Sequence, residues 1–363
     1  MTEKEYRALE IDSYSSIKVF IEDRKKYFKE FVLKEAVRDK DTDSTIFGSL
    51  VDCLLFAPHE FEDRYVMGIA QPPTGQYLDF VKELMRFTVL SLDENGRVTR
   101  ELEKMMEDAY GAVKFDRNGI AVAFKRDSFD VVKEKFIGTD LELYYRQLRD
   151  CYGKTLIEIS DLERAQNVVN ALRSNRNSRD IINLSSENTD GICEVFDQFP
   201  VIGYVPAKII GSENHFSLKG LIDRLVINHE IKEIDIYDLK TAWDNEGEFA
   251  TNYLKYKYYI QATIYYYLVI QWKNANGFSH YRVNFPSFIV AESSNYKEPL
   301  IYITDERNFK QGMKGFSLRG KYHIGVHKAI TDLVWHKETG IWTISKDNSL
   351  NKGVVRIDPF FEQ

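Results

Sequence analysis

The stretch FSLKGLIDRLVIN (Phe216–Asn228) and the stretch IKEIDIYDLKT (Ile231–Thr241) decide the fold of this chain. Both are rich in β-branched and other apolar residues, and only a short polar link separates them, which is typical of two strands joined in a hairpin. Each also carries charge within its apolar run: Asp223 in the first, and Asp238 and Lys240 in the second. The sequence therefore predicts a sheet with ionisable side chains on two neighbouring strands.

These charges indicate a metal site. Buried carboxylates are costly unless they are paired or hold a metal ion. Alternate residues of a strand face the same side, so Asp238 and Lys240 share a face. Asp223, brought alongside by the hairpin, would complete an oxygen cage for a hard cation such as Mg²⁺. Lys240 would then orient a water and stabilise charge at a phosphate, as in a metal-dependent phosphodiesterase. The alternative is a structural salt bridge between the two acids and nearby basic residues.

Two further segments carry polar residues within helical patterns. Tyr253–Trp272 has aromatic and aliphatic residues at helical spacing, with Gln261 and Tyr265 four positions apart and therefore on one face. A buried amide such as Gln261 needs hydrogen-bond partners, whereas Tyr265 has the alternative of simply packing the helix. In GSLVDCLLFAP (Gly48–Pro58), Asp52 lies at the border of an apolar stripe. Both helices are therefore candidates to supply side chains to the acidic site.

Taken in order, these segments resemble the PD-(D/E)XK nuclease superfamily. Asp223 and Asp238–Lys240 match its core motif, and Tyr258–Tyr265 is similar to the Q-x-x-x-Y helix of its RecB-like branch. Gly48–Pro58 is similar to the G-x-x-x-H-x-x-x-L-x-P helix of phage RecE-type exonucleases, and the serine-capped helix expected over Ser13–Val32 is similar to the start of that family. Four segments in the family's order are much harder to obtain by chance than one acid-x-lysine triplet.

The resemblance implies an α/β fold with a restriction-endonuclease-like core, in which a mixed central sheet is flanked by helices. It implies Mg²⁺ or Mn²⁺ as cofactor, held by Asp223, Asp238 and the carbonyl of Leu239. Lys240 would orient the attacking water or help to deprotonate it. Gln261 and Tyr265 would steady the surroundings of the metal-bound water or the DNA.

The chain departs from the family pattern at one position, where Asp52 stands in place of the usual histidine. Both side chains ligate divalent cations, but carboxylate favours Mg²⁺, Ca²⁺ and Mn²⁺. We interpret Asp52 as a replacement metal ligand, one helical turn after Gly48, which would leave open space beside it. The alternative is a solvated helix residue, and the number of metal ions stays open.

The function implied by the resemblance is hydrolysis of DNA phosphodiesters. The RecE-type similarity points to an exonuclease acting on linear double-stranded DNA, with a single-strand annealing protein as partner in phage or prophage recombination. Related exonucleases form rings, so a homo-oligomer is expected. The alternatives are an endonuclease or single-strand nuclease of a defence or anti-defence system, and a catalytically silent DNA-binding scaffold that keeps the fold.

Length and composition favour an intracellular protein. We expect a single nuclease domain over residues 1–363, with a mostly helical insertion at 61–190, where the resemblance is weakest, and the catalytic sheet and Gln261 helix at 192–304. No apolar run approaches the ~20 residues of a membrane span, and the polar start is unlike a signal peptide. We therefore expect no membrane association and a cytoplasmic location, in the host cytosol if the gene is phage-encoded. Three cysteines cannot supply the four ligands of the iron–sulfur cluster of some RecB-like relatives, so we expect no cluster.

The net charge of −7 is unusual for a protein that binds nucleic acid. A nuclease needs only a local basic track, however, because its substrate contacts a small part of the surface. Candidates for such a track are Lys255, Lys257, Arg224 and the stretch Arg319–His323. The alternative for each is an ordinary solvated surface charge.

Overall fold

The computed structural model describes residues 3–35, 42–68, 72–94, 96–116, 119–151, 153–296 and 298–355. The chain forms two compact units, one made of residues 1–58 and 164–363 and the other of residues 59–163. The second unit therefore covers most of the insertion predicted at 61–190, but residues 164–190 belong to the first unit. The boundary falls within α10 (Ile159–Ser174), whose Arg164 lies over the Phe47 ring of the first unit, 4.6 Å from its centre.

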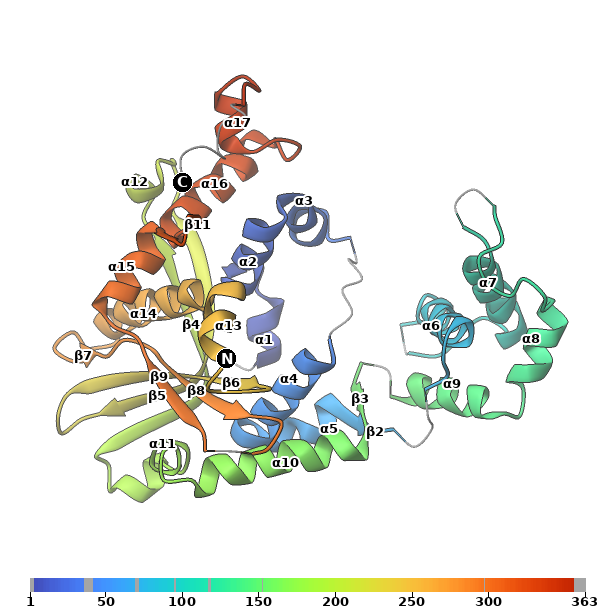
Figure 1. The fold of residues 1–363 in the computed structure, drawn as a ribbon, viewed down its shortest axis with the longest axis horizontal. Helices are drawn as coiled ribbons and strands as arrows, with labels where there is room; N and C mark the ends of the chain where they lie inside the picture. Colours follow the sequence, from blue (N-terminus) through green and yellow to red (C-terminus); the bar gives the residue numbers. More distant parts are fainter. Residues whose placement is uncertain are drawn as a thin grey trace. The chain divides into compact units, whose positions relative to one another are not determined.

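The first unit is built around a mixed sheet (Figure 1). Along one edge of β5 (Phe216–Asn228) runs antiparallel β4 (Cys193–Val205), and the other edge is shared by parallel β1 (Asp12–Ser13) and antiparallel β6 (Glu233–Ala242). From β6 the sheet continues through parallel β8 (Ser287–Glu292) to antiparallel β9 (Leu300–Ile303), and the short β7 (Arg282–Val283) pairs with β6. The predicted α/β class, with a mixed central sheet flanked by helices, is confirmed.

The two stretches that predicted the hairpin form β5 and β6. β5 has the predicted bounds, whereas β6 begins two residues later than the apolar run, at Glu233. The link between them is closed by Asn228, whose side-chain oxygen accepts the backbone N–H groups of Glu230 and Ile231, each at 3.1 Å. Asparagine favours such turns because its side chain imitates a backbone acceptor.

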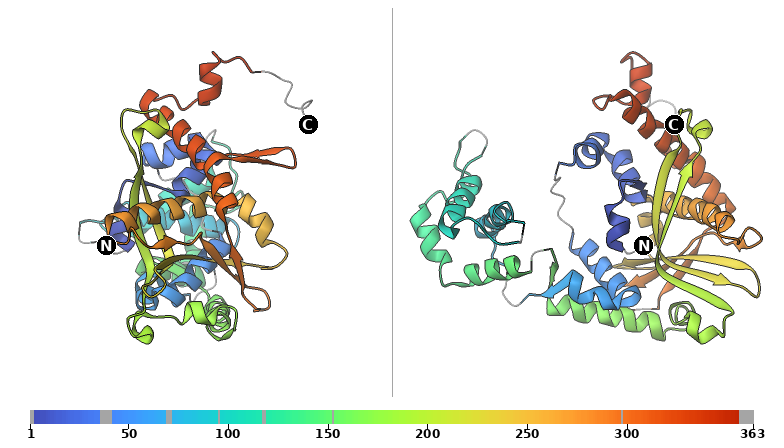
Figure 2. Two further views of the ribbon diagram at one scale, coloured as in Figure 1. Left: turned by 90° about the vertical axis from the view of Figure 1, so that its left-hand side faces the viewer. Right: turned by 180° about the vertical axis from the view of Figure 1, so that it is seen from behind.

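Helices flank this sheet (Figures 1 and 2). α2 (Tyr14–Glu22), α14 (Tyr258–Ala275) and α16 (Val326–Thr339) form the main core together with β4, β5 and β6. α4 (Asp43–Phe56) contacts β5 and β6. The remaining helices of this unit are α1 (Glu3–Ala8), α3 (Arg24–Tyr27), α11 (Arg179–Ile182), α12 (Ala207–Ile210), α13 (Phe249–Lys255), α15 (Glu306–Lys314) and α17 (Lys346–Leu350).

Two helices predicted as continuous are interrupted. The helix predicted over Tyr253–Trp272 is divided between α13 and α14, because Lys257 has a left-handed φ of 59°, which an α-helix cannot contain. The helix predicted over Ser13–Val32 is divided into α2, α3 and the π-helix η1 (Phe28–Val32), with Asp23 in an extended conformation between α2 and α3. Between α15 and α16 the chain forms a hairpin of β10 (Phe316–Leu318) and β11 (Lys321–His323). Its two turn residues, Arg319 and Gly320, have φ of 50° and 74°, the pattern of a tight two-residue hairpin turn.

The second unit is mostly helical. α6 (Gln76–Val89), α7 (Leu102–Lys114), α8 (Phe129–Phe136) and α9 (Asp140–Asp150) enclose an apolar core of their own. The unit also contains α5 (Phe61–Arg64) and a parallel pair of strands, β2 (Tyr65–Met67) and β3 (Thr155–Ile157). Its core is separate from that of the sheet, so the predicted site residues all belong to the first unit.

Candidate active site

Strands β5 and β6 pair over only part of their lengths. Their ladder joins Arg224–Asn228 to Glu233–Tyr237. Beyond Tyr237, β6 continues with β8, while β5 continues with β4 and, at Leu218 and Lys219, with β1. We call the region of separation the fork; it consists of Gly220–Asp223 of β5 and Asp238–Ala242 of β6. Backbone groups at such a separation lack ladder partners, and both predicted acids lie there.

Asp223 bridges the two strands at the fork. Its Oδ2 accepts a hydrogen bond of 2.7 Å from the backbone N–H of Leu239, at a position where β6 no longer pairs with β5. The carboxylate therefore replaces a missing ladder acceptor and holds the two strands in a fixed relation. This contact is available because Asp223 is the last residue of β5 before the ladder with β6 begins.

Gln198 of β4 belongs to the same site, although the sequence did not indicate it. The β4–β5 ladder is continuous from Cys193 to Val205 except at Gln198, which has a left-handed φ of 49° and lies opposite Asp223. Its side chain hydrogen-bonds to Asp223, which opposes part of the rise that burial causes in the pKa of that carboxyl group. A left-handed non-glycine residue costs about 1–2 kcal/mol, and such strain concentrates at functional sites. Nothing in a single sequence marks a glutamine for this conformation.

Both strands also change face at this point. Ile222 and Leu225 of β5 belong to the main core although residues three apart in a strand normally face opposite sides. Phe196 and Phe199 of β4 likewise both pack against that core. The change of face lies between the members of each pair, where Asp223 and Gln198 both line a cavity of about 390 Å³.

Asp238 is 1% exposed and takes its partners from two elements. Its Oδ2 forms an ion pair with Nζ of Lys240, so the predicted sharing of one face is observed. Its Oδ1 accepts a hydrogen bond of 2.6 Å from Nε2 of Gln261 on α14. Lys240 also donates to the carbonyl of Leu239 at 3.2 Å and lies 5.0 Å from the centre of the Tyr258 ring.

Gln261 and Tyr265 face the fork together, as their spacing predicted. Nε2 of Gln261 donates to the Tyr265 hydroxyl at 3.2 Å, and that hydroxyl donates to the carbonyl of Leu221 at 2.7 Å. The close approach requires Gly220, because a Cβ at this position would lie only 3.1 Å from the Tyr265 ring. Tyr265 is therefore more than packing: it anchors the Gln261 amide to the backbone of β5.

Asp52 reaches the fork from α4. The helix begins at Thr42, whose hydroxyl accepts the Thr45 N–H at 3.3 Å, and it ends before Pro58. Asp52 lines the same cavity of about 390 Å³ as Asp223. The predicted open space beside Asp52 is this cavity, whereas Gly48 itself lies against β6, where a Cβ would meet Oγ1 of Thr241 at an ordinary contact distance of 3.4 Å.

Burial raises the pKa values of the three acids at the fork, and neighbouring acids add to the rise for Asp52 and Asp223. Burial and then the charge of Asp238 raise the pKa of Asp223 to about 7. Burial and then the charge of Asp223 raise the pKa of Asp52 well above its usual value. Burial also raises the pKa of Asp238, against the opposing charge of Lys240. Carboxylates that resist ionisation together are the expected environment of a cation.

Lys240 responds in the opposite sense. Its burial would lower its pKa, but the charges of Asp238 and Asp223 outweigh that effect and raise it. The lysine is therefore protonated at neutral pH. A permanently charged ammonium can orient a water or stabilise negative charge, but it has no free pair with which to take a proton.

The donor set at the fork fits a hard divalent cation in its chemistry. Asp52 and Asp223 line one cavity, and carboxylate and carbonyl oxygens are the ligands that Mg²⁺ and Mn²⁺ prefer. Oε1 of Gln261 is a buried acceptor without a hydrogen-bond partner, which is uncommon away from ligand or water sites. Asp238 and the Leu239 carbonyl are engaged by Lys240. In the described part of the chain, no three His, Cys, Asp or Glu side chains lie close enough together to hold a metal ion.

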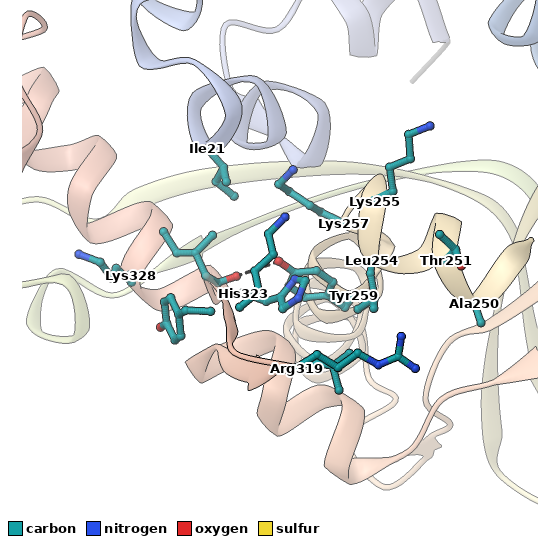
Figure 3. A pocket seen from close by; sticks show the side chains of 14 residues that line it. Ile21, Ala250, Thr251, Leu254, Lys255, Lys257, Tyr259, Arg319, His323 and Lys328 are labelled. Atoms are coloured by element: carbon teal, nitrogen blue, oxygen red, sulfur yellow. Dashed lines mark hydrogen bonds between the residues drawn. The ribbon is translucent and has the colours of Figure 1, made fainter. Parts of the chain in front are cut away.

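The basic residues predicted as a DNA track fall into two groups. Arg224 is 5% exposed, pairs with Asp197 at 2.7 Å and donates to the carbonyl of Ile182 at 2.7 Å. Arg224 is a buried residue that links β5 to β4 and to Ile182, so its prediction as part of a surface track for DNA is wrong. Lys255, Lys257 and the stretch Arg319–His323 instead come together around one pocket (Figure 3).

Comparison with known proteins yields similarity to solved structures alone. No protein-family model matches the chain, and no curated protein matches it in sequence. A crystal structure of a candidate exonuclease from Eubacterium rectale aligns with a TM-score of 0.42 at 11% identity, covering 98% of this chain and 88% of that protein. At this identity and TM-score the similarity identifies neither a family nor an activity. No helix among the described residues is long and apolar enough to cross a membrane.

Proposed function

We propose that the protein is a metal-dependent nuclease that hydrolyses DNA phosphodiester bonds at the fork. The observation that carries this proposal is the position of Asp223 and Asp238 on adjoining strands at the fork, where Asp238 pairs with Lys240 and Asp52 lines the same cavity as Asp223. A structural salt bridge would need one acid for one lysine. Three mutually repelling carboxylates instead lower stability unless they bind a cation.

Asp223 and Asp238, with the Leu239 carbonyl and Asp52, are the residues that would hold Mg²⁺ or Mn²⁺. A bound divalent cation supplies a water of lowered pKa and offsets charge at the phosphate. Lys240 orients the water and stabilises negative charge, as its raised pKa allows. Gln261 fixes the orientation of the Asp238 carboxylate at 2.6 Å. Tyr265 positions Gln261 through its own bond to β5.

The finer proposal follows the resemblance to phage RecE-type exonucleases in the PD-(D/E)XK superfamily. It specifies an exonuclease on linear double-stranded DNA, acting in recombination with a single-strand annealing protein, as a homo-oligomer in the cytoplasm. The segments that support it are those containing Asp52, Asp223, Asp238–Lys240 and Gln261. Replacement of the family's histidine by Asp52 is the point where this chain would differ from its relatives.

The decisive experiment is digestion of end-labelled linear duplex and of closed circular duplex with Mg²⁺, Mn²⁺, Ca²⁺ or EDTA. We expect mononucleotide or short products from the linear substrate with Mg²⁺ or Mn²⁺, none in EDTA, and no cutting of the circle. Cutting of the circle would replace the exonuclease by an endonuclease. No cleavage of either DNA with any metal would overturn the nuclease proposal in favour of a silent scaffold.

A further inference from the structure

A second polar region of the first unit, the basic pocket, has a volume of about 910 Å³. It is lined by α13, the first turn of α14, the β10–β11 hairpin and α16, and Figure 3 shows Lys255, Lys257, Arg319 and Lys328 around it. No aspartate or glutamate is among its lining residues. Acids outnumber bases by 56 to 49 in the whole chain, so this lining departs sharply from the average surface. Its cationic residues are Lys255, Lys257, Arg319, Lys321 and Lys328.

Some of these cations have internal partners and others do not. Lys257 pairs with Glu22 at 2.8 Å, and Lys328 pairs with Asp332 at 2.9 Å. Lys255, Arg319 and Lys321 form no ion pair with any residue that the structure describes. Unpaired cations gathered in one concave surface raise its potential and attract an extended anion.

The β10–β11 hairpin also presents apolar surface beside these charges. Tyr322 is 53% exposed and Leu318 is 43% exposed, and both line the pocket. A ligand made of phosphates alone would not contact an exposed aromatic ring. An exposed aromatic side chain beside lysine and arginine is the combination that binds single-stranded nucleic acid, because unpaired bases stack on the ring while cations follow the backbone. In a duplex the bases are already stacked on one another.

We propose that the basic pocket binds single-stranded nucleic acid, with Arg319 and Lys321 on its phosphates and Tyr322 against a base. The pocket meets the fork at the first turn of α14: Tyr259 lines the pocket, while Tyr258 contacts Lys240. Lys18 lies close enough to both regions that, after burial, the charges of Lys257 and Lys240 help to lower its pKa. If the protein is the nuclease proposed above, the pocket would receive a single strand that leaves the fork. Binding of a single strand by the pocket does not depend on that function.

The test is fluorescence anisotropy with a labelled oligothymidylate in EDTA, over a series of salt concentrations. The variant Arg319→Gln/Lys321→Gln should bind about tenfold more weakly at ~0.1 M salt, and the slope of log affinity against log salt should fall by about 1.4. The matched control is Arg307→Gln/Lys310→Gln, which removes the same charges from the exposed side of α15 and should bind like wild type. Unchanged affinity and slope in the hairpin variant would overturn the proposal.

The ring contact has its own test. Tyr322→Ala should weaken oligothymidylate binding about tenfold without changing the salt slope, and Tyr322→Phe should bind like wild type, because stacking needs the ring alone. If Tyr322→Ala bound normally and inorganic polyphosphate competed as well as the oligonucleotide, the pocket would be a general polyanion site, and the single-strand assignment would be wrong. If the wild-type protein cleaves DNA but the Arg319→Gln/Lys321→Gln variant binds oligothymidylate normally, only the proposal for the basic pocket is wrong. If that variant loses binding but the wild-type protein cleaves no DNA, only the nuclease proposal is wrong.

Discussion

The fork and the basic pocket share the first turn of α14, yet they are built in opposite ways. At the fork, Asp223 accepts the Leu239 N–H and the buried Asp238 bonds to Gln261 and Lys240, so both acids are held in place before any ligand arrives. In the pocket, Arg319 and Lys321 lie on the β10–β11 hairpin and have no acidic partner among the described residues. Fixed placement suits chemistry on one bond, whereas cations without acidic partners suit contact with a phosphate backbone. The net charge of the chain does not reveal that acids gather at the fork and cations in the basic pocket.

The largest expected effect comes from removing an acid at the fork. Asp223→Asn and Asp238→Asn should each abolish cleavage and weaken Mn²⁺ binding about tenfold or more, because each removes a charged ligand of a hard cation. Calorimetric titration with Mn²⁺ measures the affinity directly. Asp235→Asn on the same strand is the matched control, since Asp235 is engaged with Asn284 at 2.7 Å, away from the fork. Unchanged Mn²⁺ affinity in both site variants would make the acids structural.

Lys240→Ala should reduce the cleavage rate by about 10²–10³ while leaving oligonucleotide binding nearly intact, because it removes a positioned charge at the reacting phosphate. Single-turnover digestion of end-labelled duplex measures the rate. The control is Lys208→Ala on α12, an exposed lysine that lines neither the cavity at the fork nor the basic pocket. A wild-type rate in Lys240→Ala would remove Asp238–Lys240 from the catalytic assignment. If Lys240→Ala instead lost most of its oligonucleotide binding, Lys240 would serve to bind nucleic acid, as proposed for the basic pocket.

Asp52 should show a smaller and metal-dependent effect. Asp52→Ala should lose activity with both Mg²⁺ and Mn²⁺, whereas Asp52→His should retain substantial activity with Mn²⁺, because imidazole suits a transition metal better than Mg²⁺. The ratio of Mn²⁺-supported to Mg²⁺-supported rates in the two variants is the measurement. If Asp52→Ala cleaves like wild type, Asp52 is a bystander, and the fork has two protein carboxylates.

The smallest effect is on stability. Burial and Asp238 raise the pKa of Asp223 from 3.8 to about 7, so the folded state binds more protons between these pH values, and metal-free stability falls as pH rises from about 4 to about 7. Asp223→Asn cannot ionise and should be more stable than wild type at pH ~8 in EDTA, by about 1–2 kcal/mol after allowance for solvent screening. Thermal melts at pH ~8 and ~4 test this, because the difference should disappear at the lower pH. A variant less stable at both values would show that the Leu239 contact outweighs repulsion.

The sequence alone determined the two central strands, β5 and β6, and the identity of the main charged residues. Long β-branched runs are strong local signals, so β5 was predicted with its exact bounds, and period-two alternation correctly paired Asp238 with Lys240. Helical spacing likewise brought Gln261 and Tyr265 to one face. Each of these rests on neighbours within a few positions, where the geometry of one element decides the outcome.

Tertiary structure decided what depends on segments far apart in the chain. The sequence suggested a surface cation at Arg224, whereas in the structure Arg224 is buried and pairs with Asp197, 27 residues away. The break at Lys257, the face change near Gln198 and the meeting of Lys255 with Arg319 arise where separate elements must fit together. Such fits depend on the packing of residues distant in sequence and on the cost of leaving strand groups unpaired, and local propensity contains neither quantity.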